Sequence, residues 1–290
     1  MTVRQPIVAG AFYPRSPDVC RRDVERLVQA AELPDDLPAR LVGGIVPHAG
    51  WVFSGALAAR TLKALLAGGG VRTAVLFGAD HRGTVREGEV YPRGAWRTPL
   101  GDVPIDEDLA AAVLEGTDCC RANPDAHAGE HSLEVQVPIL HVLAENLRIL
   151  PIAVPPTDLA PRVGSAVGKV LAGREDVCVV GSTDLTHHGS RYGFAPGGRN
   201  EAGEQWARAN DRRMIDRMES MDAGAVVAEA REHHNACGAG AIAATLAASR
   251  ELGATRGLCL AYTNSYEIVH EKYPWELDDS TVGYAAVVFG

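Results

Sequence analysis

Residues 41 to 78 have the pattern of a strand, a helix and a second strand, and this unit restricts the folds open to the chain. LVGGIV (41–46) is strand-like, FSGALAARTLKALLAG (53–68) has apolar residues at helical spacing and ends in glycines, and TAVLFG (73–78) returns to strand character. Two strands joined by a helix usually lie parallel in a sheet that helices cover. The unit therefore predicts an α/β fold.

The rest of the chain continues this alternation. Residues 87–106 are broken by glycine and proline and indicate an excursion from the main sheet, with 90–96 as a short hairpin or edge strand. Further elements are expected as strands at 147–154, 177–182, 258–265 and 282–290, and as helices at 106–116, 131–145, 159–173 and, two or three in number, within 201–250. There is no internal repeat and no long linker. We expect a single domain over residues 1–290, a three-layer αβα structure with a mixed or mostly parallel central sheet.

Composition and charge exclude several classes of protein. The chain is 46% hydrophobic and carries a formal net charge of -9 without a Lys/Arg-rich run, which argues against nucleic-acid binding. Its start, MTVRQPIVAGAFYP, lacks the features of a signal peptide, and no apolar run reaches the roughly 18 residues of a membrane span. Six scattered cysteines form no CxxC pair, which argues against a disulfide framework or a zinc ribbon. A cytoplasmic location is expected.

Polar side chains follow three of the predicted strands. His48 comes just after the first strand and His81 just after the second, while the strand at 177–182 is followed by Asp184, His187 and His188. Ligands of open α/β sheets bind in the crevice beyond the carboxyl ends of the strands. Histidines collected there can reach one atom, and a metal ion is the natural candidate. Each histidine alone is more often a structural residue of a turn, so the argument rests on their joint occurrence.

Cys237 is a further candidate. It follows His233, His234 and Asn235 and precedes a helix of small residues, so its sulfur is expected near a helix N-terminus, where a thiolate is favoured. A thiolate there is either a nucleophile or a soft metal ligand. The alternative is a cysteine buried as a small hydrophobe, which better describes Cys178 and Cys259 in their apolar strands.

The segment HAGEH at 127–131 suggests a rival function. It matches the H-x-x-E-H pattern of some zinc peptidases, with Glu134 as an extra carboxylate. Pro124 and Gly129 make its first half a loop, which disfavours the required pair of histidines on one helical face. Glu130 and His131 remain candidates for a general acid and base, or for groups that hold the site residues in place.

Other catalytic patterns are weaker. No nucleophile elbow and no glycine-rich nucleotide loop follows a strand, which disfavours serine hydrolases and nucleotide-binding proteins. The tryptophans at positions 51, 96 and 275 either line a pocket or cap the core.

Several of these residues belong to segments that together resemble one family. The segments are VAGAFYP (8–14), VPHAGWVFSG (46–55), GADH (78–81), RTPLG (97–101), EHSLEVQVP (130–138), GSTDLTHHG (181–189), NACG (235–238) and VGYAA (282–286). Their order and spacing resemble the Memo-like family, whose prokaryotic members are called AmmeMemoRadiSam system protein B. The resemblance covers almost the whole chain.

The resemblance implies a LigB-like fold, similar to that of the class III extradiol dioxygenases, which are non-haem iron enzymes. It also implies a pocket with two histidines and a cysteine, which correspond to His48, His81 and Cys237, with Asp184 and His187 as further pocket residues. The chain departs from the commoner family pattern at Ala79-Asp80 and at Thr186, beside these residues. A soft thiolate in place of a carboxylate changes the metal preference, so catechol cleavage is not inherited from the fold.

Two hypotheses follow from the sequence. The first is a non-haem iron or copper oxidoreductase, dioxygenase-like, that binds iron(II), or else copper or zinc, and in which His187 acts as acid or base while Asp184 orients it. The second is a scaffold that binds a peptide or protein and acts with the AMMECR-type and radical SAM partners that the family name implies. No nucleic acid or membrane is expected as a partner, and the substrate, a small molecule or a peptide, is not specified.

Overall fold

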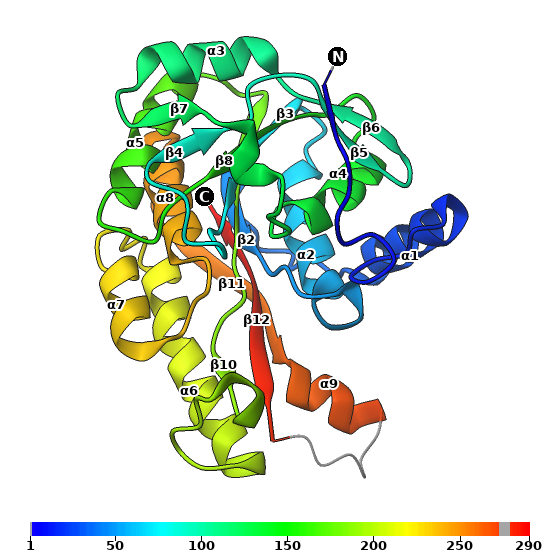
Figure 1. Ribbon diagram of the computed structural model, residues 1–290, viewed down its shortest axis with the longest axis vertical. Coiled ribbons are helices and arrows are strands. Elements are labelled where there is room, and N and C mark those ends of the chain that lie inside the picture. Colours follow the sequence, from blue (N-terminus) through cyan, green and yellow to red (C-terminus); the bar gives the residue numbers. More distant parts are fainter. Residues whose placement is uncertain (1, 273–278) are drawn as a thin grey trace.

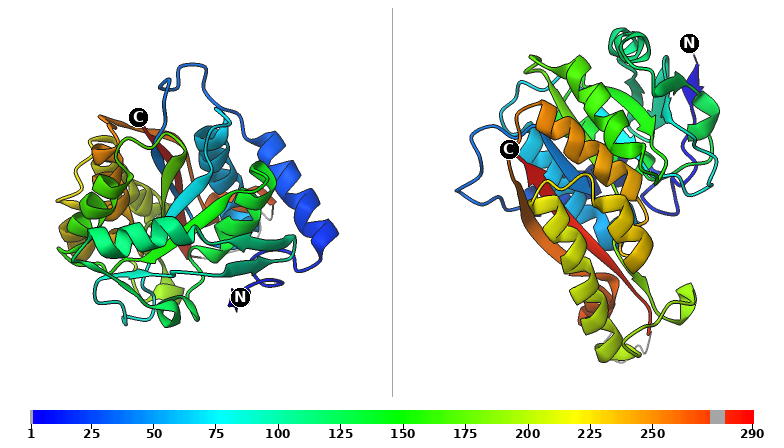
Figure 2. Two further views of the ribbon diagram at one scale, coloured as in Figure 1. Left: turned by 90° about the horizontal axis from the view of Figure 1, so that it is seen from above. Right: turned by 90° about the vertical axis from the view of Figure 1, so that its left-hand side faces the viewer.

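The computed structural model describes residues 2–272 and 279–290, and these residues form an α/β fold with helices on both faces of a large mixed sheet (Figures 1 and 2). The expected three-layer αβα class is confirmed. The expected strand at 73–78 and the one at 177–182 have the predicted bounds.

The large sheet has four parallel strands at its centre and antiparallel strands toward its edges. Its order is β10-β12-β2-β9-β3-β8-β4-β7, with β11 also paired to β12. The strands are β2 (Gly43–Val46), β3 (Thr73–Gly78), β4 (Gly88–Val90), β7 (Cys120–Ala122), β8 (Arg148–Ala153), β9 (Val177–Ser182), β10 (His187–His188), β11 (Gly257–Asn264) and β12 (Thr281–Phe289). Because β2, β9, β3 and β8 run parallel, their carboxyl ends lie along one edge of the sheet.

Two helical layers cover this sheet. The longer helices are α1 (Pro17–Ala30), α2 (Trp51–Leu66), α3 (Glu107–Gly116), α4 (Val137–Leu143), α5 (Ala160–Leu171), α6 (Asn200–Glu219), α7 (Val226–His233), α8 (Ala239–Glu251) and α9 (Ser265–Lys272). Neighbouring strand residues alternate between two cores: Ile45 packs with the layer that contains α5 and α8, and Val46 packs with the layer that contains α1, α2 and α4. This alternation is the side-chain period of a strand buried on both faces.

Close packing of α5 on α8 depends on two glycines. A Cβ atom at Gly164 would lie 2.0 Å from the carbonyl oxygen of Ala244, and one at Gly168 would lie 2.9 Å from the same group of Ala248. The two helices therefore approach more closely than side chains at these positions would allow. Their contact fixes α8, which begins next to Cys237, against the centre of the sheet.

The segment expected as an excursion divides between two sheets. β5 (Ala95–Thr98) and β6 (Gly101–Pro104) pair antiparallel and join β1 (Val3–Arg4) in a separate three-stranded sheet. β4, in contrast, pairs with β7 and β8 at the edge of the large sheet. The expected hairpin or edge strand over 90–96 is therefore wrong, because its two halves lie in different sheets and both β4 and β5 have a partner strand on each side.

The expected helix at 131–145 is shorter than predicted. A 3₁₀ turn at Glu134–Gln136 precedes α4, and Glu130 and His131 lie outside any helix. The backbone N–H of Ser132 donates to the Glu130 carboxylate at 2.8 Å, a local bond that competes with helix formation. Pro138 suits the first turn of α4. No helix among residues 2–272 and 279–290 has the length and hydropathy needed to cross a bilayer.

Candidate metal centre

Three of the site residues lie where parallel strands end. His48 follows β2 by two residues, His81 follows β3 by three, and Asp184 follows β9 by two. Because β9 pairs with both β2 and β3, the three turns meet at one edge of the sheet. Cys237 reaches the same place from the loop before α8, where its backbone N–H donates to the carbonyl oxygen of Asp184 at 3.2 Å.

His48, His81 and Cys237 form a group with the geometry of a metal site. One candidate ligand atom from each lies within 4.8 Å of the others, and Sγ of Cys237 is 3.2 Å from Nε2 of His48. The two imidazole rings are nearly perpendicular, with centroids 5.0 Å apart. His48 and Cys237 are 189 positions apart in the sequence. The three residues could therefore hold one metal ion only because the fold brings them together.

A serine fixes the orientation of the His48 ring. Nδ1 of His48 is 2.9 Å from Oγ of Ser182, and that hydroxyl donates to the carbonyl oxygen of Ser132 at 2.8 Å. Since the hydroxyl proton is used in the second bond, Oγ accepts from His48, which places the ring proton on Nδ1. Nε2 then presents a free lone pair toward Cys237. Burial, followed by the nearby His81 and His131, holds the pKa of His48 well below its usual range.

A carboxylate fixes the orientation of the His81 ring. Glu130 accepts from Nδ1 of His81 at 3.0 Å and from the backbone N–H of His81 at the same distance. Burial opposes a charged ring, but the Cys237 sulfur and the Glu130 carboxylate outweigh it and raise the pKa of His81 to about 10. Burial is likewise outweighed at Glu130, whose pKa His81 holds well below its usual range.

The residues His81, Glu130 and His131 form a second group that could hold a metal ion. In this group both oxygens of Glu130 already accept hydrogen bonds, from His81 and from Ser132. Glu130 thus has the contacts of a residue that orients His81 rather than those of a separate metal ligand.

Cys237 is a half-buried residue, and its sulfur lies against main-chain groups of the turn that follows β9. It accepts from the backbone N–H of Asp184 at 3.3 Å. Burial raises the pKa of the thiol, while His81 acts in the opposite direction. Because a metal ligand must be the thiolate, binding of a metal would release this proton.

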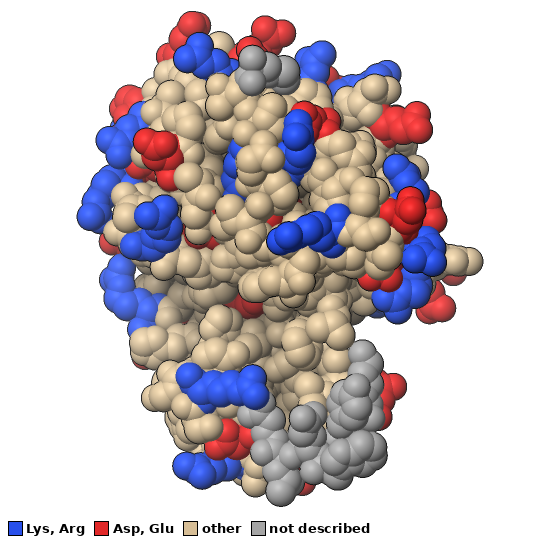
Figure 3. Space-filling model, turned by 45° about the vertical axis from the view of Figure 1, so that its right-hand side comes forward, with Lys and Arg blue, Asp and Glu red and all other residues tan. Residues whose placement is uncertain are grey.

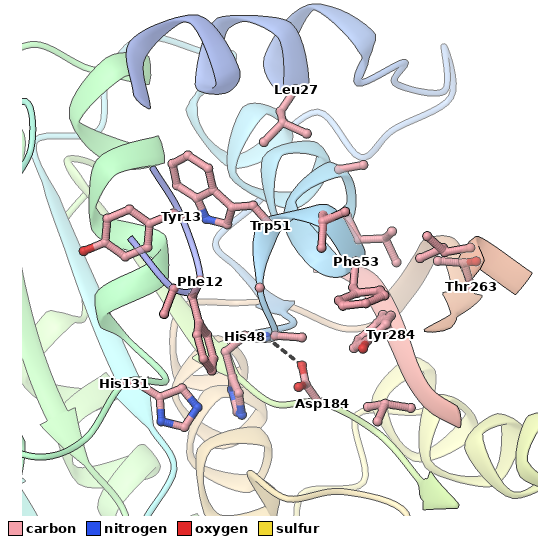
Figure 4. Close-up of a pocket in the computed structure, with 18 of the residues that line it drawn as sticks. Phe12, Tyr13, Leu27, His48, Trp51, Phe53, His131, Asp184, Thr263 and Tyr284 are labelled. Atoms are coloured by element: carbon pink, nitrogen blue, oxygen red, sulfur yellow. Dashed lines mark hydrogen bonds between the residues drawn. The ribbon is translucent and has the colours of Figure 1, made fainter. Parts of the chain in front are cut away.

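Asp184 holds a main-chain turn, and its side-chain hydrogen bond goes to the backbone of His48 rather than to the ring of His187. Its carboxylate accepts from the backbone N–H of His48 at 2.7 Å (Figure 4) and also from that of Ala49. Burial outweighs these bonds and raises the pKa of Asp184 to about 7. The carboxyl group therefore fixes the position of His48.

His131 and His187 have rings on the wall of a cavity of about 1070 Å³. The ring of His131 lies against Phe12, with centroids 5.1 Å apart, and that of His187 lies 5.0 Å from Tyr192. Burial lowers the pKa of His131 and lowers that of His187 to about 4, so both rings are neutral at physiological pH. A neutral imidazole can both accept and donate a proton.

The cavity also contacts His48, His81 and Asp184, and aromatic side chains form much of its wall. Figure 4 shows Phe12, Tyr13, Trp51, Phe53 and Tyr284 around it. Figure 3 shows the molecular face that is hollowed between the larger upper part and the smaller lower part, where few coloured charges lie in the hollow. An organic molecule with substantial apolar surface fits such a wall.

Two other residues named from the sequence have structural roles. Nε2 of His127 is 2.8 Å from the carbonyl oxygen of Glu89, and its ring packs against Tyr91 and Trp96. Neither metal-capable group found among the described residues includes it. The H-x-x-E-H peptidase geometry is therefore not formed, because His127 ends a short 3₁₀ helix while residues 128–131 lie outside any helix, so the two histidines do not share one helical face. His188 is buried and contacts the carbonyl oxygen of Pro196 at 2.9 Å.

Glu134 anchors the N-terminal segment. It accepts from Arg4 at 2.8 Å, from the backbone N–H groups of Ile7 and Val8, and from the hydroxyl of Tyr13.

The tryptophans named from the sequence have different places in the fold. Trp51 lines the cavity, Trp96 packs beside Arg4, and position 275 lies outside the described residues. Sequence reasoning missed the hydrogen bond between Ser182 and Nδ1 of His48. The one available signal was that Ser182 is a hydroxyl residue at the end of a strand that leads into the site.

Comparison with known proteins gives a consistent result along the whole chain. A family profile described as Memo-like protein matches residues 4–288. MEMO1 family proteins of Pyrococcus abyssi and Methanopyrus kandleri are each 36% identical to the chain, over 99% of it and over 99% and 98% of their own lengths. A MEMO1 family protein of Nitrosopumilus maritimus is 29% identical over 99% of both chains.

Proposed function

This chain belongs to the Memo-like family, and we propose that it carries out a metal-dependent reaction. In this proposal His48, His81 and Cys237 bind one transition-metal ion. The ion takes part in redox or oxygen chemistry on an organic molecule in the large cavity. The proximity of these three side chains is the observation that carries the proposal. A dioxygenase-like activity belongs to the proposal as well.

The donor atoms fit such an ion. Metal bonds to imidazole nitrogen and thiolate sulfur are about 2.0 to 2.3 Å long, so two such donors on one ion lie roughly 3 to 3.5 Å apart. The distance of 3.2 Å between Sγ of Cys237 and Nε2 of His48 agrees with this spacing. The hydrogen bonds of Ser182 and Glu130 to Nδ1 atoms leave both Nε2 atoms for the ion.

The choice of metal follows from the donor set. Two imidazoles and one thiolate suit iron(II), copper or zinc. We propose iron(II) first, with copper or zinc as alternatives. When bound, a metal with three protein ligands supplies open positions for a small molecule and, for iron or copper, a change of oxidation state.

The surrounding side chains bind the organic molecule and move its protons. Phe12, Trp51 and Phe53 provide apolar contact area that excludes water. His187 and His131, both neutral, accept a proton from the bound molecule or return one to it. Asp184 keeps the His48 turn in position through its two main-chain hydrogen bonds.

Metal analysis of protein purified without oxygen tests the proposal. Wild-type protein is expected to contain about one ion per chain, and His48→Ala and Cys237→Ala are expected to lose it. Cys259→Ala, which removes a half-buried thiol from β11, is the matched control and should retain the metal. Metal-free wild-type protein that does not take up iron(II), copper or zinc on addition would refute the proposal. Two ions per chain would mean that the group of His81, Glu130 and His131 holds a second ion.

A binding role is the second candidate. The cavity of about 1070 Å³ exceeds what most small ligands need, and Val52 on its wall is 63% exposed. A peptide or partner protein, including the AMMECR-type and radical SAM proteins implied by the family name, would occupy this surface. Unchanged partner binding by His48→Ala and Cys237→Ala would favour this role over the enzymatic one.

A cytoplasmic location belongs to the same proposal. All six cysteines lie within the described residues and none forms a disulfide. A site that needs a reduced Cys237 favours a reducing compartment. Fractionation of cells, with the redox state of Cys237 measured in each fraction, tests this point.

A further inference from the structure

The residues of the candidate centre line two different cavities. His48 and His81 line the large cavity of about 1070 Å³, and Cys237 lines a separate depression of about 460 Å³. His187 and Tyr192 line both. The turn that carries Asp184 and His187 therefore lies between the cavity that His48 and His81 line and the one that Cys237 lines.

The smaller cavity has its own chemical character. Leu185, Phe194, Ala230 and Ala236 supply an apolar wall beside Cys237 and His187. None of its described lining residues is an acid, a lysine or an arginine. The polar groups on its wall, from Cys237, His187, Tyr192 and His234, can hydrogen-bond to an uncharged ligand, and no carboxylate, ammonium or guanidinium group is there to pair with a charged one, so the cavity favours an uncharged ligand.

Two rings stand on the wall of this cavity. Phe194 contacts the ring of His234 edge to face, with centroids 5.1 Å apart. His234 ends α7 in the left-handed region, with a φ of 52°, a conformation that a residue other than glycine seldom adopts. This turn places the exposed His234 ring beside Phe194, and both residues line the small cavity.

We propose that the centre is approached from two sides: the large cavity takes the organic substrate against His48 and His81, and the small cavity admits a small uncharged molecule to the sulfur of Cys237 and to His187. This assignment deepens the proposed function, since two approaches serve one reaction only if a metal lies between them. Access to the sulfur through the small cavity is a property of the protein alone and does not depend on the metal.

Alkylation of Cys237 in metal-free protein tests the route. The thiolate displaces iodide from iodoacetamide and forms a carbon–sulfur bond, and peptide mass spectrometry gives the rate at this cysteine separately from the other five. Ala236→Leu narrows the small cavity, and Ala56→Leu, at an exposed position of α2, narrows the large one. The same alanine-to-leucine change is thus made on each side of the site.

The two variants are expected to differ. Ala236→Leu should slow the reaction at least about fivefold, Phe194→Ala should accelerate it, and Ala56→Leu should leave it unchanged, because thiol reactivity follows access. Iodoacetamide should also be preferred over the anionic iodoacetate more strongly than by the same cysteine in the urea-unfolded chain. A slower reaction in Ala56→Leu with no change in Ala236→Leu and Phe194→Ala would overturn the proposal.

The metal proposal and this one fail in different ways. Protein that binds no metal but shows the expected alkylation pattern would remove the enzymatic role and leave the second approach to Cys237. Protein with one bound metal and the reverse pattern would leave the metal site and assign both reactants to the large cavity. Phe194→Ala keeps the test decisive if Ala236→Leu does not fold.

Discussion

The His81 side and the His48 side of the site use the same main-chain contact with opposite electrostatic results. Each histidine donates its backbone N–H to a carboxylate, at 3.0 Å to Glu130 and at 2.7 Å to Asp184. The pKa of Glu130 nevertheless lies well below its usual range, while that of Asp184 is raised to about 7. The same local bond is therefore compatible with a charged acid and with a neutral one.

The difference lies in what each carboxylate does with the imidazole. Glu130 also reaches Nδ1 of His81, and the pair shares a charge interaction. The Nδ1 atom of His48 is instead held by the neutral hydroxyl of Ser182, and Asp184 is buried against neutral main-chain N–H groups. One ligand is thus oriented by an ionic contact and the other by a neutral one, within a single candidate centre.

Removal of the ionic contact should have the largest effect. Glu130→Ala leaves the ring of His81 and the N–H of Ser132 without their acceptor, and metal affinity is expected to fall about 10- to 100-fold. Glu130→Gln keeps an acceptor oxygen and should retain most of the affinity lost in the alanine variant. Titration with iron(II) or cobalt(II) measures both. Equal affinities in wild type and Glu130→Ala would show that the carboxylate does not position His81.

Removal of the neutral contact should have a smaller effect. Ser182→Ala deprives Nδ1 of His48 and the carbonyl oxygen of Ser132 of their partner, which should lower the stability by about 1 to 3 kcal/mol. Metal affinity should also fall, since the ring is free to turn. Ser249→Ala is the control: its buried hydroxyl has no partner among the described residues, so little change is expected. If both variants denature alike in urea, the Ser182 bond contributes nothing.

A third buried acid, Asp211, which contacts Thr186 next to His187, sharpens the comparison through pH. Asp211 accepts from the backbone N–H of Thr186 at 2.8 Å and from the hydroxyl of Tyr262 at 2.7 Å, yet burial raises its pKa to about 7. The folded state then binds this proton more tightly than the unfolded state. The resulting stability is present at low pH and is lost as the pH rises through about 7.

Asp211→Asn should remove this dependence. Between pH 6 and pH 8.5 the wild-type protein is expected to lose about 1 kcal/mol more stability than the variant. Urea denaturation at the two pH values measures the difference, with the exposed Asp216→Asn as control. Parallel pH profiles for wild type and Asp211→Asn would mean that Asp211 is charged in the folded protein, like Glu130.

The central part of the fold could be predicted from the sequence because its signals are local. The runs at 73–78 and 177–182 are fully buried strands, and their apolar residues are bounded by turn residues. Since parallel strands end at one edge, the strand pattern by itself was enough to place His48 and His81 together. Cys237 is distant in sequence, and its place beside them depended on the family resemblance.

The remaining differences arise from contacts that no local pattern encodes. The helix predicted from residue 131 begins later because Glu130 bonds to Ser132 and His81, and the latter lies 49 positions away. Asp184 was expected to orient His187, and its hydrogen bond with the backbone N–H of His48, 136 positions away, is a contact that the sequence does not indicate. The pairing of Ser182 with His48 is of the same kind.

The bonds of Glu134 have a practical consequence for anyone who prepares this protein. Residues 4 to 13 are tied to this one carboxylate, and Phe12, within the same stretch, forms part of the cavity wall against His131. A deletion of the first dozen residues would therefore remove a wall of the cavity and leave a buried charge without its partners. Affinity tags at this end are best joined through a flexible spacer before Val3, so that the β1 pairing and the cavity are preserved.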